Sequence, residues 1–454
     1  MLFRSTSSLG CNRILNGSYT VGGASADFSN IAQIFQELTT CGISGNVTFN
    51  FRSGTYNENM VFSGTIPGMT SNDTITFTSI AGNADSVIIQ STATALSLGN
   101  VNNLVFNHLT FNVSNGMYGV LFNNPCENIE INHCHIKSNP NGSSFAGIYK
   151  TTSAGVVNNI RILNNIIDGG GYNIYFYGGT GTSEYANNIR IDGNTLSNAY
   201  EYGCYLYYTN FKSISNNTII ARSSNISSSY YGMYIYYCNA TLINGNKIHV
   251  MTSIPNAFGI QSYYLNYLNA SGTGLISNNE LMINSSTNNG HGMYIYYSKV
   301  NIYHNSIHIT SNSAARGIYA YTSTTYPIAI RQNNIGSFSS MVYPMYLPSL
   351  NGITLNYNNY YGSYIGYVNS GISNMALWKM FTGQDVNSTN IVPTFVNINT
   401  HLKTDGFGLT CNRNNNILYD ITGASRGIIT TVGAYNDFII LPYNIMPKTL
   451  ISPN

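Results

Sequence analysis

A short segment that recurs along most of the chain constrains the fold more than any other feature of the sequence. In it an aliphatic residue is followed three places later by asparagine and five places later by another apolar residue. The segment occurs ten times, once with the asparagine replaced, at intervals of 23 to 33 residues. The copies are LVFNHL (104–109), IEINHCHI (129–136), IRILNNII (160–167), IRIDGNTL (189–196), ISNNTI (214–219), INGNKI (243–248), ISNNEL (276–281), IYHNSI (302–307), IRQNNI (330–335) and LNYNNY (355–360). Their asparagines are Asn107, Asn165, Asn194, Asn217, Asn246, Asn279, Asn305, Asn333 and Asn358, and Cys134 takes this place in the second copy.

This variable period is typical of a coil of three short parallel strands whose connecting turns differ in length. Coils of this kind bury their core against their neighbours, so 454 residues need not divide into several domains. The repeated asparagine suits a left-handed bend, and its amide can bond to the asparagine one coil away as an internal ladder. We therefore predict an all-β fold, a single right-handed parallel β-helix. Residues 1–60 would form an N-terminal cap and the first strands, residues 61–362 the coils, and residues 363–454 a C-terminal capping segment.

A second segment lies about half a coil from each asparagine segment and alternates with the period of a strand. Clear copies are GCYLYY (203–208), GMYIYY (232–237 and 292–297) and GIYAYT (317–322). One set of alternate positions is predicted to point into the core: Val120, Ile148, Ile174, Cys204, Met233, Ile260, Met293, Ile318 and Met345.

The intervening positions predict two outward columns of tyrosine. The first comprises Tyr149, Tyr175, Tyr205, Tyr234, Tyr294, Tyr319 and Tyr346, and the second Tyr177, Tyr207, Tyr236, Tyr263, Tyr296 and Tyr321. Because coils stack about 4.8 Å apart, neighbouring rings would lie within stacking distance and stabilise the sheet. A long exposed strip of phenols would equally suit sugar rings or a partner surface. With both roles open, the predicted binding residues are Tyr149, Tyr175, Tyr205, Tyr207, Tyr234, Tyr236, Tyr294, Tyr296, Tyr319, Tyr321 and Tyr346.

Charge is scarce throughout the sequence. Only 7% of the residues are charged, and 18 basic against 16 acidic residues leave a net charge of +2, too little to favour nucleic acid or an anionic membrane as a partner. No apolar stretch reaches the roughly 18 residues of a membrane-spanning helix. The seven cysteines are irregularly spaced and include no CxxC pair, so most are expected in the core, and the spacing leaves their pairing open.

The segment before the coils, residues 15–59, is predicted to contain a short helix. Ser29 or Asn30 can cap it, Ile31 to Leu38 gives it an apolar stripe, and a strand from Val47 to Phe51 follows. Such a segment would close the open end of the stack.

The two ends of the chain resemble a known family, the secreted or surface-exposed parallel β-helix proteins of Bacteroidota. The opening matches in SYTVGG and CGISGNVTFNFRSGTYNE, and the closing region in ALWKMFTGQDVNSTNIVPTFVN (376–397), DITGASRG (420–427) and VGAYNDF (432–438). Together with the coils, these segments cover nearly the whole chain. The resemblance implies an extracellular protein exported by the type IX route, although the sorting domain that such proteins usually carry is not visible after LISPN.

The fold is also similar to that of pectate lyases, polygalacturonases and phage tailspikes, which raises carbohydrate chemistry without establishing it. Glycoside hydrolysis generally needs two carboxyl groups roughly 5 to 9.5 Å apart, yet Glu280 is the only acid between Tyr202 and Gln384. The main acidic neighbourhood contains Glu127, Glu130, Asp168, Glu184, Asp192 and Glu201. Its catalytic candidates, Asp168 and Asp192, fall in different columns of the repeat. A GHG triplet at 290–292 resembles that of polygalacturonases but lacks their paired aspartates and Arg-x-Lys motif. The histidines are scattered and form no repeated ligand set, so neither a metal nor a cofactor is expected.

The sequence thus predicts an extracellular or cell-surface module for adhesion, carbohydrate binding or partner binding through a tyrosine-lined face. Two alternatives stay open. One is a polysaccharide lyase or glycoside hydrolase that uses the early acidic patch. The other is a structural subunit of a surface filament, because the ends of a β-helix offer unpaired strand edges for end-to-end association.

Overall fold

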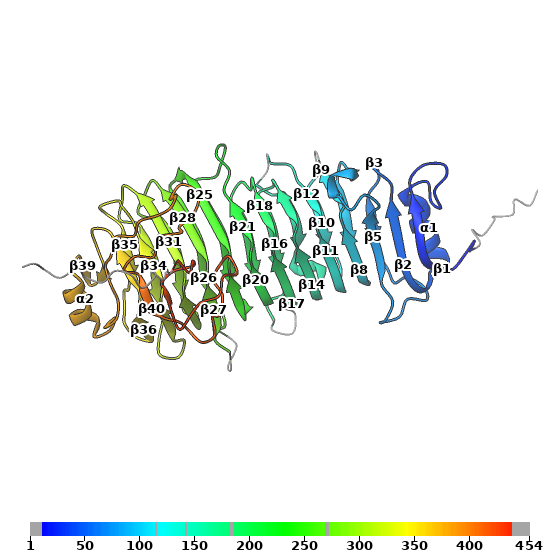
Figure 1. The fold of residues 1–454 in the computed structure, drawn as a ribbon. Helices are drawn as coiled ribbons and strands as arrows, with labels where there is room; N and C mark the ends of the chain where they lie inside the picture. Colours follow the sequence, from blue (N-terminus) through cyan, green and yellow to red (C-terminus); the bar gives the residue numbers. More distant parts are fainter. Residues whose placement is uncertain (1–10, 114–115, 141–142, 182–184, 268–271, 438–454) are drawn as a thin grey trace, which may run out of the picture.

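The computed structural model describes residues 11–113, 116–140, 143–181, 185–267 and 272–437. They form an elongated stack of coils in which three parallel sheets run the length of the molecule (Figure 1). Each coil contributes one strand to each sheet in turn, and equivalent strands of successive coils are hydrogen-bonded in register. The predicted parallel β-helix is therefore confirmed.

Within the described residues, the strands of each sheet lie side by side in the order in which they occur along the chain. Sheet A contains β1 (Leu15–Val21), β2 (Ile43–Phe51), β5 (Ile75–Ser79), β8 (Val101–Asn107), β11 (Cys126–Asn132), β14 (Val157–Leu163), β17 (Ala186–Asp192), β20 (Thr209–Ser215), β24 (Leu242–Asn244), β27 (Gly274–Ser277), β30 (Val300–Tyr303), β33 (Ile328–Arg331) and β36 (Ile353–Asn356), with β23 (Asn239–Ala240) also paired to β20. Sheet B contains β3 (Gly54–Tyr56), β6 (Val87–Ser91), β9 (Thr110–Val113), β12 (His135–Lys137), β15 (Ile166–Asp168), β18 (Thr195–Ser197), β21 (Thr218–Ile220), β25 (Lys247–Ile254), β28 (Glu280–Ser285), β31 (Ser306–Ser311), β34 (Asn334–Gly336) and β37 (Asn359–Tyr361). Sheet C contains β4 (Met60–Phe62), β7 (Thr94–Leu98), β10 (Tyr118–Phe122), β13 (Ala146–Lys150), β16 (Tyr172–Tyr177), β19 (Tyr202–Tyr207), β22 (Ser229–Tyr236), β26 (Asn256–Tyr263), β29 (His291–Tyr296), β32 (Arg316–Tyr321), β35 (Tyr343–Tyr346) and β38 (Gly366–Val368), closed by the antiparallel β39 (Ser370–Ile372). The remaining elements are the helices α1 (Ile31–Thr40) and α2 (Met375–Thr382), the short 3-10 turns Ala84–Ser86 and Thr152–Ala154, and the hairpin of β40 (Thr410–Asn412) and β41 (Ile429–Thr431).

The core follows from the alternation of side chains along each strand. The residues of sheet C that were predicted to point inward, from Val120 to Met345, are all fully buried, as are Phe176, Leu206 and Ile235 two places further on. Aromatic stacking reinforces the first coils, where the ring centroids of Phe49 and Phe77 lie 5.1 Å apart. The predicted aliphatic and sulfur-containing core is confirmed.

The asparagine ladder is also confirmed, from Asn165 through Asn194, Asn217, Asn246, Asn279, Asn305 and Asn333 to Asn358. From Asn194 onward, each side-chain oxygen accepts hydrogen bonds from the backbone N–H and the amide group of the ladder residue one coil earlier, at 2.9 to 3.1 Å. The Asn165 oxygen accepts from the backbone N–H of Cys134 at 2.9 Å. Each amide group also donates to a backbone carbonyl, as from Asn246 to Ile214 at 2.9 Å. The ladder thus satisfies buried backbone groups at the turn from sheet A to sheet B.

Two details of the predicted ladder are wrong. Asn107 is not a member, because it ends β8 opposite Asn132, and Leu109 takes the ladder position of that coil. The segment 104–109 matches the pattern two residues out of register. In addition, the ladder asparagine does not adopt the left-handed conformation. The residue before it does, as in Asn164 (φ 54°) and Asn216 (φ 56°).

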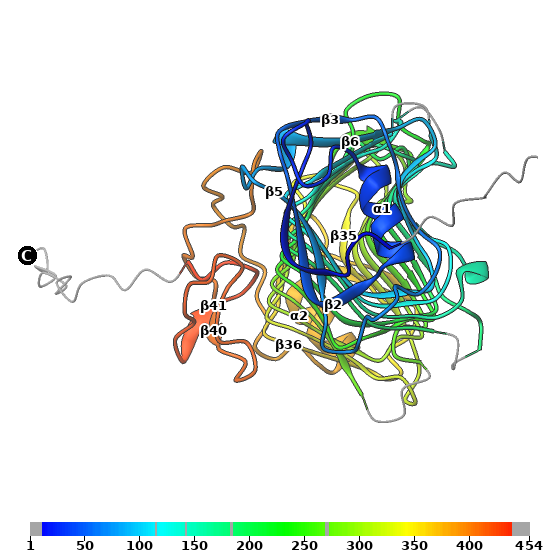
Figure 2. The ribbon, with the colours of Figure 1, turned by 90° about the vertical axis from the view of Figure 1, so that its right-hand side faces the viewer.

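Both ends of the stack are covered within the described residues. At the N-terminal end, α1 lies across the first coil (Figure 2), and Asn30 caps it by accepting a hydrogen bond from the backbone N–H of Gln33. At the other end, Trp378 of α2 is fully buried, and its indole N–H donates to Asp385 at 2.7 Å. Asp385 also accepts a hydrogen bond from the Tyr360 hydroxyl at 2.9 Å, so the last coil is closed by a satisfied polar cluster.

Residues 384–437, which we call the strap, return along the outside of the coils (Figure 2, orange to red). The strap is fixed by buried polar contacts. The fully buried Arg426 donates to the side chain of Asn278 at 2.9 Å and to backbone carbonyls of the strap itself, including Gly433. Glu280 accepts hydrogen bonds from the Leu402 N–H at 2.7 Å and from the Tyr435 hydroxyl at 2.5 Å. The single acid of the later coils therefore anchors the strap.

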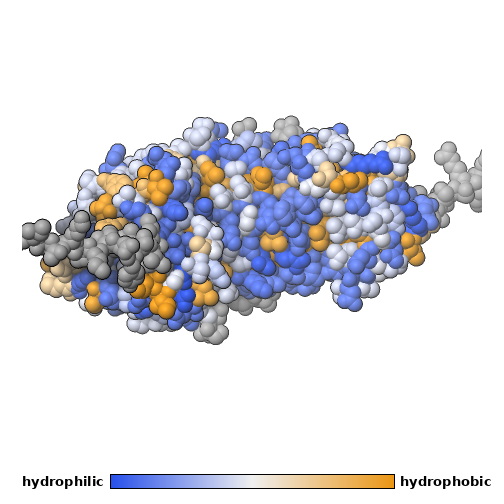
Figure 3. All heavy atoms as spheres, viewed as in Figure 1, coloured by the Kyte–Doolittle hydropathy of each residue, from blue (hydrophilic) through white to orange (hydrophobic). Residues whose placement is uncertain are grey.

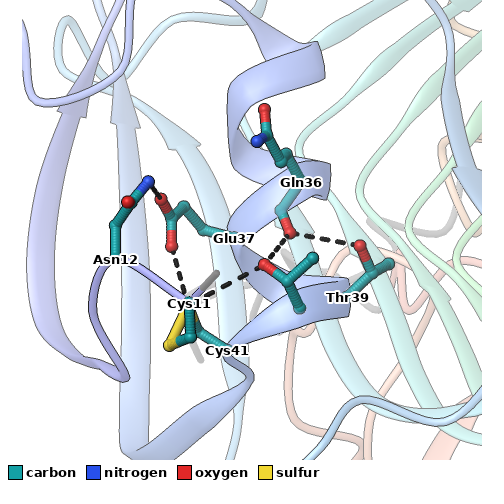
Figure 4. The surroundings of a disulfide bond; sticks show 7 residues. Cys11, Asn12, Gln36, Glu37, Thr39 and Cys41 are labelled. Carbon is teal, nitrogen blue, oxygen red and sulfur yellow. Dashed lines mark hydrogen bonds between the residues drawn. A yellow bond between two sulfur atoms is a disulfide. The ribbon is translucent and has the colours of Figure 1, made fainter. Parts of the chain in front are cut away.

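The structure contains one disulfide among the described residues. Cys11 and Cys41 form a disulfide with a Cα–Cα distance of 4.8 Å, joining the first described residues to the C-terminal end of α1 (Figure 4). Beside it, Asn12 donates to Glu37 at 2.7 Å. The other five cysteines are buried, as expected. No helix in the described parts of the chain has the length and apolar character needed to cross a membrane.

Candidate binding surface

The outer face of sheet C carries the aromatic side chains, since its strands alternate between the core and the surface. The predicted first column is in register from Tyr149 to Tyr346 and continues to Tyr367, with Gln261 in one coil. The predicted second column is in register from Tyr177 to Tyr321. All eleven tyrosines singled out from the sequence lie half-buried on this one face.

Two further columns were not predicted from the sequence. The edge column precedes the first column on each strand: Tyr118, Ala146, Tyr172, Tyr202, Tyr231, Phe258, His291, Arg316 and Tyr343. The turn column follows the second and contains Tyr208, Tyr237, Tyr264 and Tyr297, all with positive φ. The repeated YY doublets carried the signal for the turn column, because the second tyrosine of each doublet leaves the strand. We call the four columns together the tyrosine face.

The rings pack in a herringbone pattern. Within a column they stack nearly parallel, with centroids 4.8 Å apart for Tyr175 and Tyr205 and 4.7 Å apart for Tyr207 and Tyr236. Between the edge and first columns they are nearly perpendicular, as for Tyr202 and Tyr205 at an interplanar angle of 84°. These are favourable geometries for aromatic pairs, so the predicted stabilising role of the columns has a clear basis.

This packing determines what the face offers to a ligand. Tyr205, for example, is stacked on Tyr175 and Tyr234, so both faces of its ring are occupied by other rings. Ring edges and hydroxyl groups remain to meet a ligand. Burial raises the pKa of Tyr205 to about 12 and that of Tyr294 still further above its usual range. The hydroxyls therefore remain protonated hydrogen-bond donors throughout the physiological pH range.

The herringbone is interrupted in the coil of β26. Gln261 replaces tyrosine in the first column, and its amide group donates to the Tyr263 hydroxyl at 3.0 Å. Tyr263 is tilted by 46° relative to Tyr234 and by 47° relative to Tyr294. The rings of Tyr234 and Tyr294 therefore contact Tyr263 at an angle instead of stacking on a first-column ring in this coil.

Arg316 is the one charged residue in the four columns. Its guanidinium lies 4.5 Å from the ring centroid of Tyr346 and donates to the backbone oxygen of Asn288 at 3.0 Å. No carboxylate of the described residues lies within ion-pair distance of it. The neighbouring His291 is neutral, because burial and the charge of Arg316 lower its pKa to about 3. The face is therefore almost uncharged, with a single unpaired cation.

The acidic candidates of the sequence do not converge. Asp168 lies on sheet B and accepts hydrogen bonds from Ser197 and Asn198, both at 2.6 Å. Asp192 lies on sheet A, where Arg190 pairs with it at 3.0 Å and Ser213 donates at 2.7 Å. Both carboxylates are thus engaged in structural contacts on different sheets. Glu184 lies outside the described residues, and His291 of the GHG triplet belongs to the edge column.

The described residues contain no group of three or more His, Cys, Asp or Glu side chains placed to hold a metal ion. In comparisons with known proteins, no family model and no curated protein matches this sequence. The sheet topology and the aromatic stacking therefore identify the molecule as an all-β parallel β-helix with a tyrosine-rich face.

Proposed function

We propose that the protein is an extracellular binding module whose tyrosine face contacts a carbohydrate chain. The observation that carries this proposal is the set of four aligned columns, which expose ring edges and phenol hydroxyls along successive coils on one face of the molecule. Hydroxyl groups both donate and accept hydrogen bonds, so such rows match the hydroxyl groups of a polysaccharide. Arg316 is the one charged residue of the four columns, and so low a charge favours a neutral chain over a strongly anionic one.

The proposed extracellular location is supported by two features. The Cys11–Cys41 disulfide is typical of proteins that fold in an oxidising compartment. The resemblance of the terminal segments to surface β-helix proteins of Bacteroidota, and with it export by the type IX route, points in the same direction.

The mode of contact leads to a specific test. Sugar rings commonly stack on an open aromatic face, but in this protein the faces are covered by other rings, so the hydroxyl edges must supply most of the contact. Changing Tyr205, Tyr234, Tyr294 and Tyr319 together to Phe removes four hydroxyls and leaves the ring stacking in place. We expect this variant to lose at least about tenfold in affinity for the polysaccharide that binds the unchanged protein, because several hydrogen bonds of about 0.5 to 1.5 kcal/mol are lost together.

The measurement is a glycan-array screen followed by titration of the polysaccharides that bind. Tyr303→Phe is the control, because it removes a half-buried hydroxyl from sheet A, away from the tyrosine face. Absence of binding to every glycan by the folded protein would overturn the proposal. Release of shortened products would instead favour the lyase or hydrolase alternative.

A further inference from the structure

A groove of about 420 Å³ lies at the corner where sheet C passes into sheet A. Its walls include Asn188 of β17, Asn210 and Lys212 of β20, and Asn239 of β23. The turn tyrosines Tyr208 and Tyr237 come two residues before Asn210 and Asn239, so the groove adjoins the tyrosine face. Its size is within the range of roughly 300 to 1,000 Å³ that is usual for small-molecule sites.

The groove exists because the coils change register at this point. The pairing of β17 with β20 shifts between Ala186 and Arg190, so no residue of β20 continues the column of Asn188. On the far side of the groove, Gly274 packs closely against Asn266. A β-carbon added at Gly274 would lie 2.3 Å from the amide nitrogen of the Asn266 side chain. The register shift and this tight approach leave a hollow between successive coils.

Two columns of surface asparagine end in the hollow. In one, each amide group donates to the asparagine of the previous coil, from Asn128 to Asn103, from Asn159 to Asn128 and from Asn188 to Asn159 at 3.1 Å. In the other, Asn210 donates to Asn187, and Asn239 donates to Asn210 at 2.7 Å. Because the donors all point back along the helix, the last carbonyl oxygen of each column has no donor among the described residues.

The groove therefore combines two free amide acceptors, on Asn188 and Asn239, with one ammonium donor. Lys212 is exposed and has no carboxylate partner in the described part of the chain. No acidic residue lines the groove, which makes a cation an unsuitable ligand. Amide oxygens that accept from hydroxyls, beside an ammonium that donates to oxygens, suit a polyhydroxylated ring.

We propose that this groove binds a neutral sugar unit of the chain that lies on the tyrosine face. The inference rests on the proposed function and adds to it a defined binding site at the corner of the β-helix. In this arrangement the tyrosine columns hold the length of the chain, and the groove fixes the position of one unit through Asn188, Asn239 and Lys212.

The test uses variants that occupy or weaken the groove without touching its asparagine columns. Thr241→Trp places a large ring over the groove, because Thr241 is an exposed lining residue, and Lys212→Gln removes the ammonium. Thr354→Trp, at an exposed position of β36 on the same sheet, is the matched control. The probes are neutral hexasaccharides of glucose, xylose and mannose, titrated by calorimetry against the full chain.

We expect Thr241→Trp to lower the affinity for the hexasaccharide that binds by at least about tenfold, Lys212→Gln by a few fold, and Thr354→Trp not at all. If Thr241→Trp binds the hexasaccharide with the same affinity as the unchanged protein, the proposal that the groove binds a sugar is wrong. If the tyrosine variant described above then still loses affinity, the tyrosine face stands and the groove alone fails. If the unchanged protein binds none of the probes and no glycan of the array, both proposals fail together.

Discussion

At the scale of single residues, the least expected side chain is Lys150. It occupies an inward position of sheet C between Phe122 and Phe176 and is fully buried. Its ammonium donates to the backbone oxygens of Thr151 at 2.9 Å and Tyr177 at 2.8 Å. Burial lowers the pKa of Lys150 to about 8. A charge in this place costs stability, because two carbonyls replace only part of its hydration.

We expect Lys150→Met to stabilise the protein by about 1 to 3 kcal/mol at pH 7, because an apolar chain of similar length replaces a buried cation. The pH dependence follows from the lowered pKa. The folded protein releases the Lys150 proton near pH 8 and the unfolded chain near pH 10.4, so the unchanged protein gains stability between these values. The advantage of the variant should therefore be largest below pH 8 and shrink above it. Calorimetric Tm values at a fixed scan rate check this, and an advantage that does not vary between pH 7 and pH 10 would contradict it.

At the scale of elements, the ladder and the strap show how polar groups hold an almost uncharged protein together. Asn246 alone makes four of the contacts at its turn: it accepts from the backbone and amide nitrogens of Asn217 and donates to Asn279 and Ile214. Buried amides of this kind are costly to lose, because each leaves a partner unpaired.

We expect Asn246→Leu to destabilise the protein by about 3 kcal/mol, since the Asn217 N–H and the Ile214 oxygen lose their partners inside the stack. Asn301→Leu is a matched control, because Asn301 is a half-buried residue of β30, on sheet A, whose side chain points outward. Thermal unfolding of both variants measures the effect. Equal Tm values would show that the ladder contributes no more than a surface asparagine.

The strap should respond to acid. Burial acts to raise the pKa of Glu280, but the hydrogen bonds from His249, Tyr435 and the Leu402 backbone outweigh it and leave the pKa lowered. A carboxyl group with a lowered folded pKa stabilises the folded state above its unfolded pKa of about 4.3, and this contribution is lost as the pH falls through the lower folded value.

We therefore expect Glu280→Gln to increase backbone hydrogen exchange around Leu402 at neutral pH, and acid to have the same effect on the unchanged protein. Asp405→Asn, at an exposed carboxylate of the strap, is the control. If Glu280→Gln left the exchange of the strap unchanged, the anchoring role of Glu280 would be wrong.

The elements that the sequence could predict are those that repeat. Nine of the ten asparagine segments indicate the position of the ladder correctly, and nine segments indicate that of the sheet C strand. Single irregularities therefore do not hide the pattern. The error at Asn107 arose because the segment 104–109 matches the pattern two residues before the true ladder position, which Leu109 occupies. The strap repeats nothing, and its anchors join residues as far apart as Glu280 and Tyr435, 155 positions along the chain, so no local pattern could reveal them. The groove was missed because it depends on a register shift between two strands.

At the scale of the whole molecule, the covered ends bear on the filament alternative. The last coil would offer strand edges for pairing with another copy, but α2 and β39 lie beyond it (Figure 1). Trp378 and Asp385 fix this cover. The surface in Figure 3 is mainly hydrophilic, although hydrophobic patches lie at the end where Figure 1 places the strap. The strap itself has large exposed hydrophobic side chains, since Phe407 is 82% exposed and Ile428 is 81% exposed.

End-to-end association should therefore require a damaged cap. We expect the unchanged protein to scatter light as a monomer at all concentrations, and Trp378→Ala to show concentration-dependent growth, because loss of the buried indole frees the last strands. Phe381→Ala, an exposed change on the same helix, is the control. Growth of the unchanged protein at micromolar concentration would support the filament alternative instead.

The regular stacking of the tyrosine columns also sets how such a protein can change over generations. Most coils of the later stack add the same kind of stripe to the face, and each coil contacts only its neighbours. Duplication or deletion of one coil would lengthen or shorten the face by about 4.8 Å without the need for a new core. Avidity for a repetitive polymer could then be adjusted by recombination between coils, in steps, rather than by optimising individual contacts.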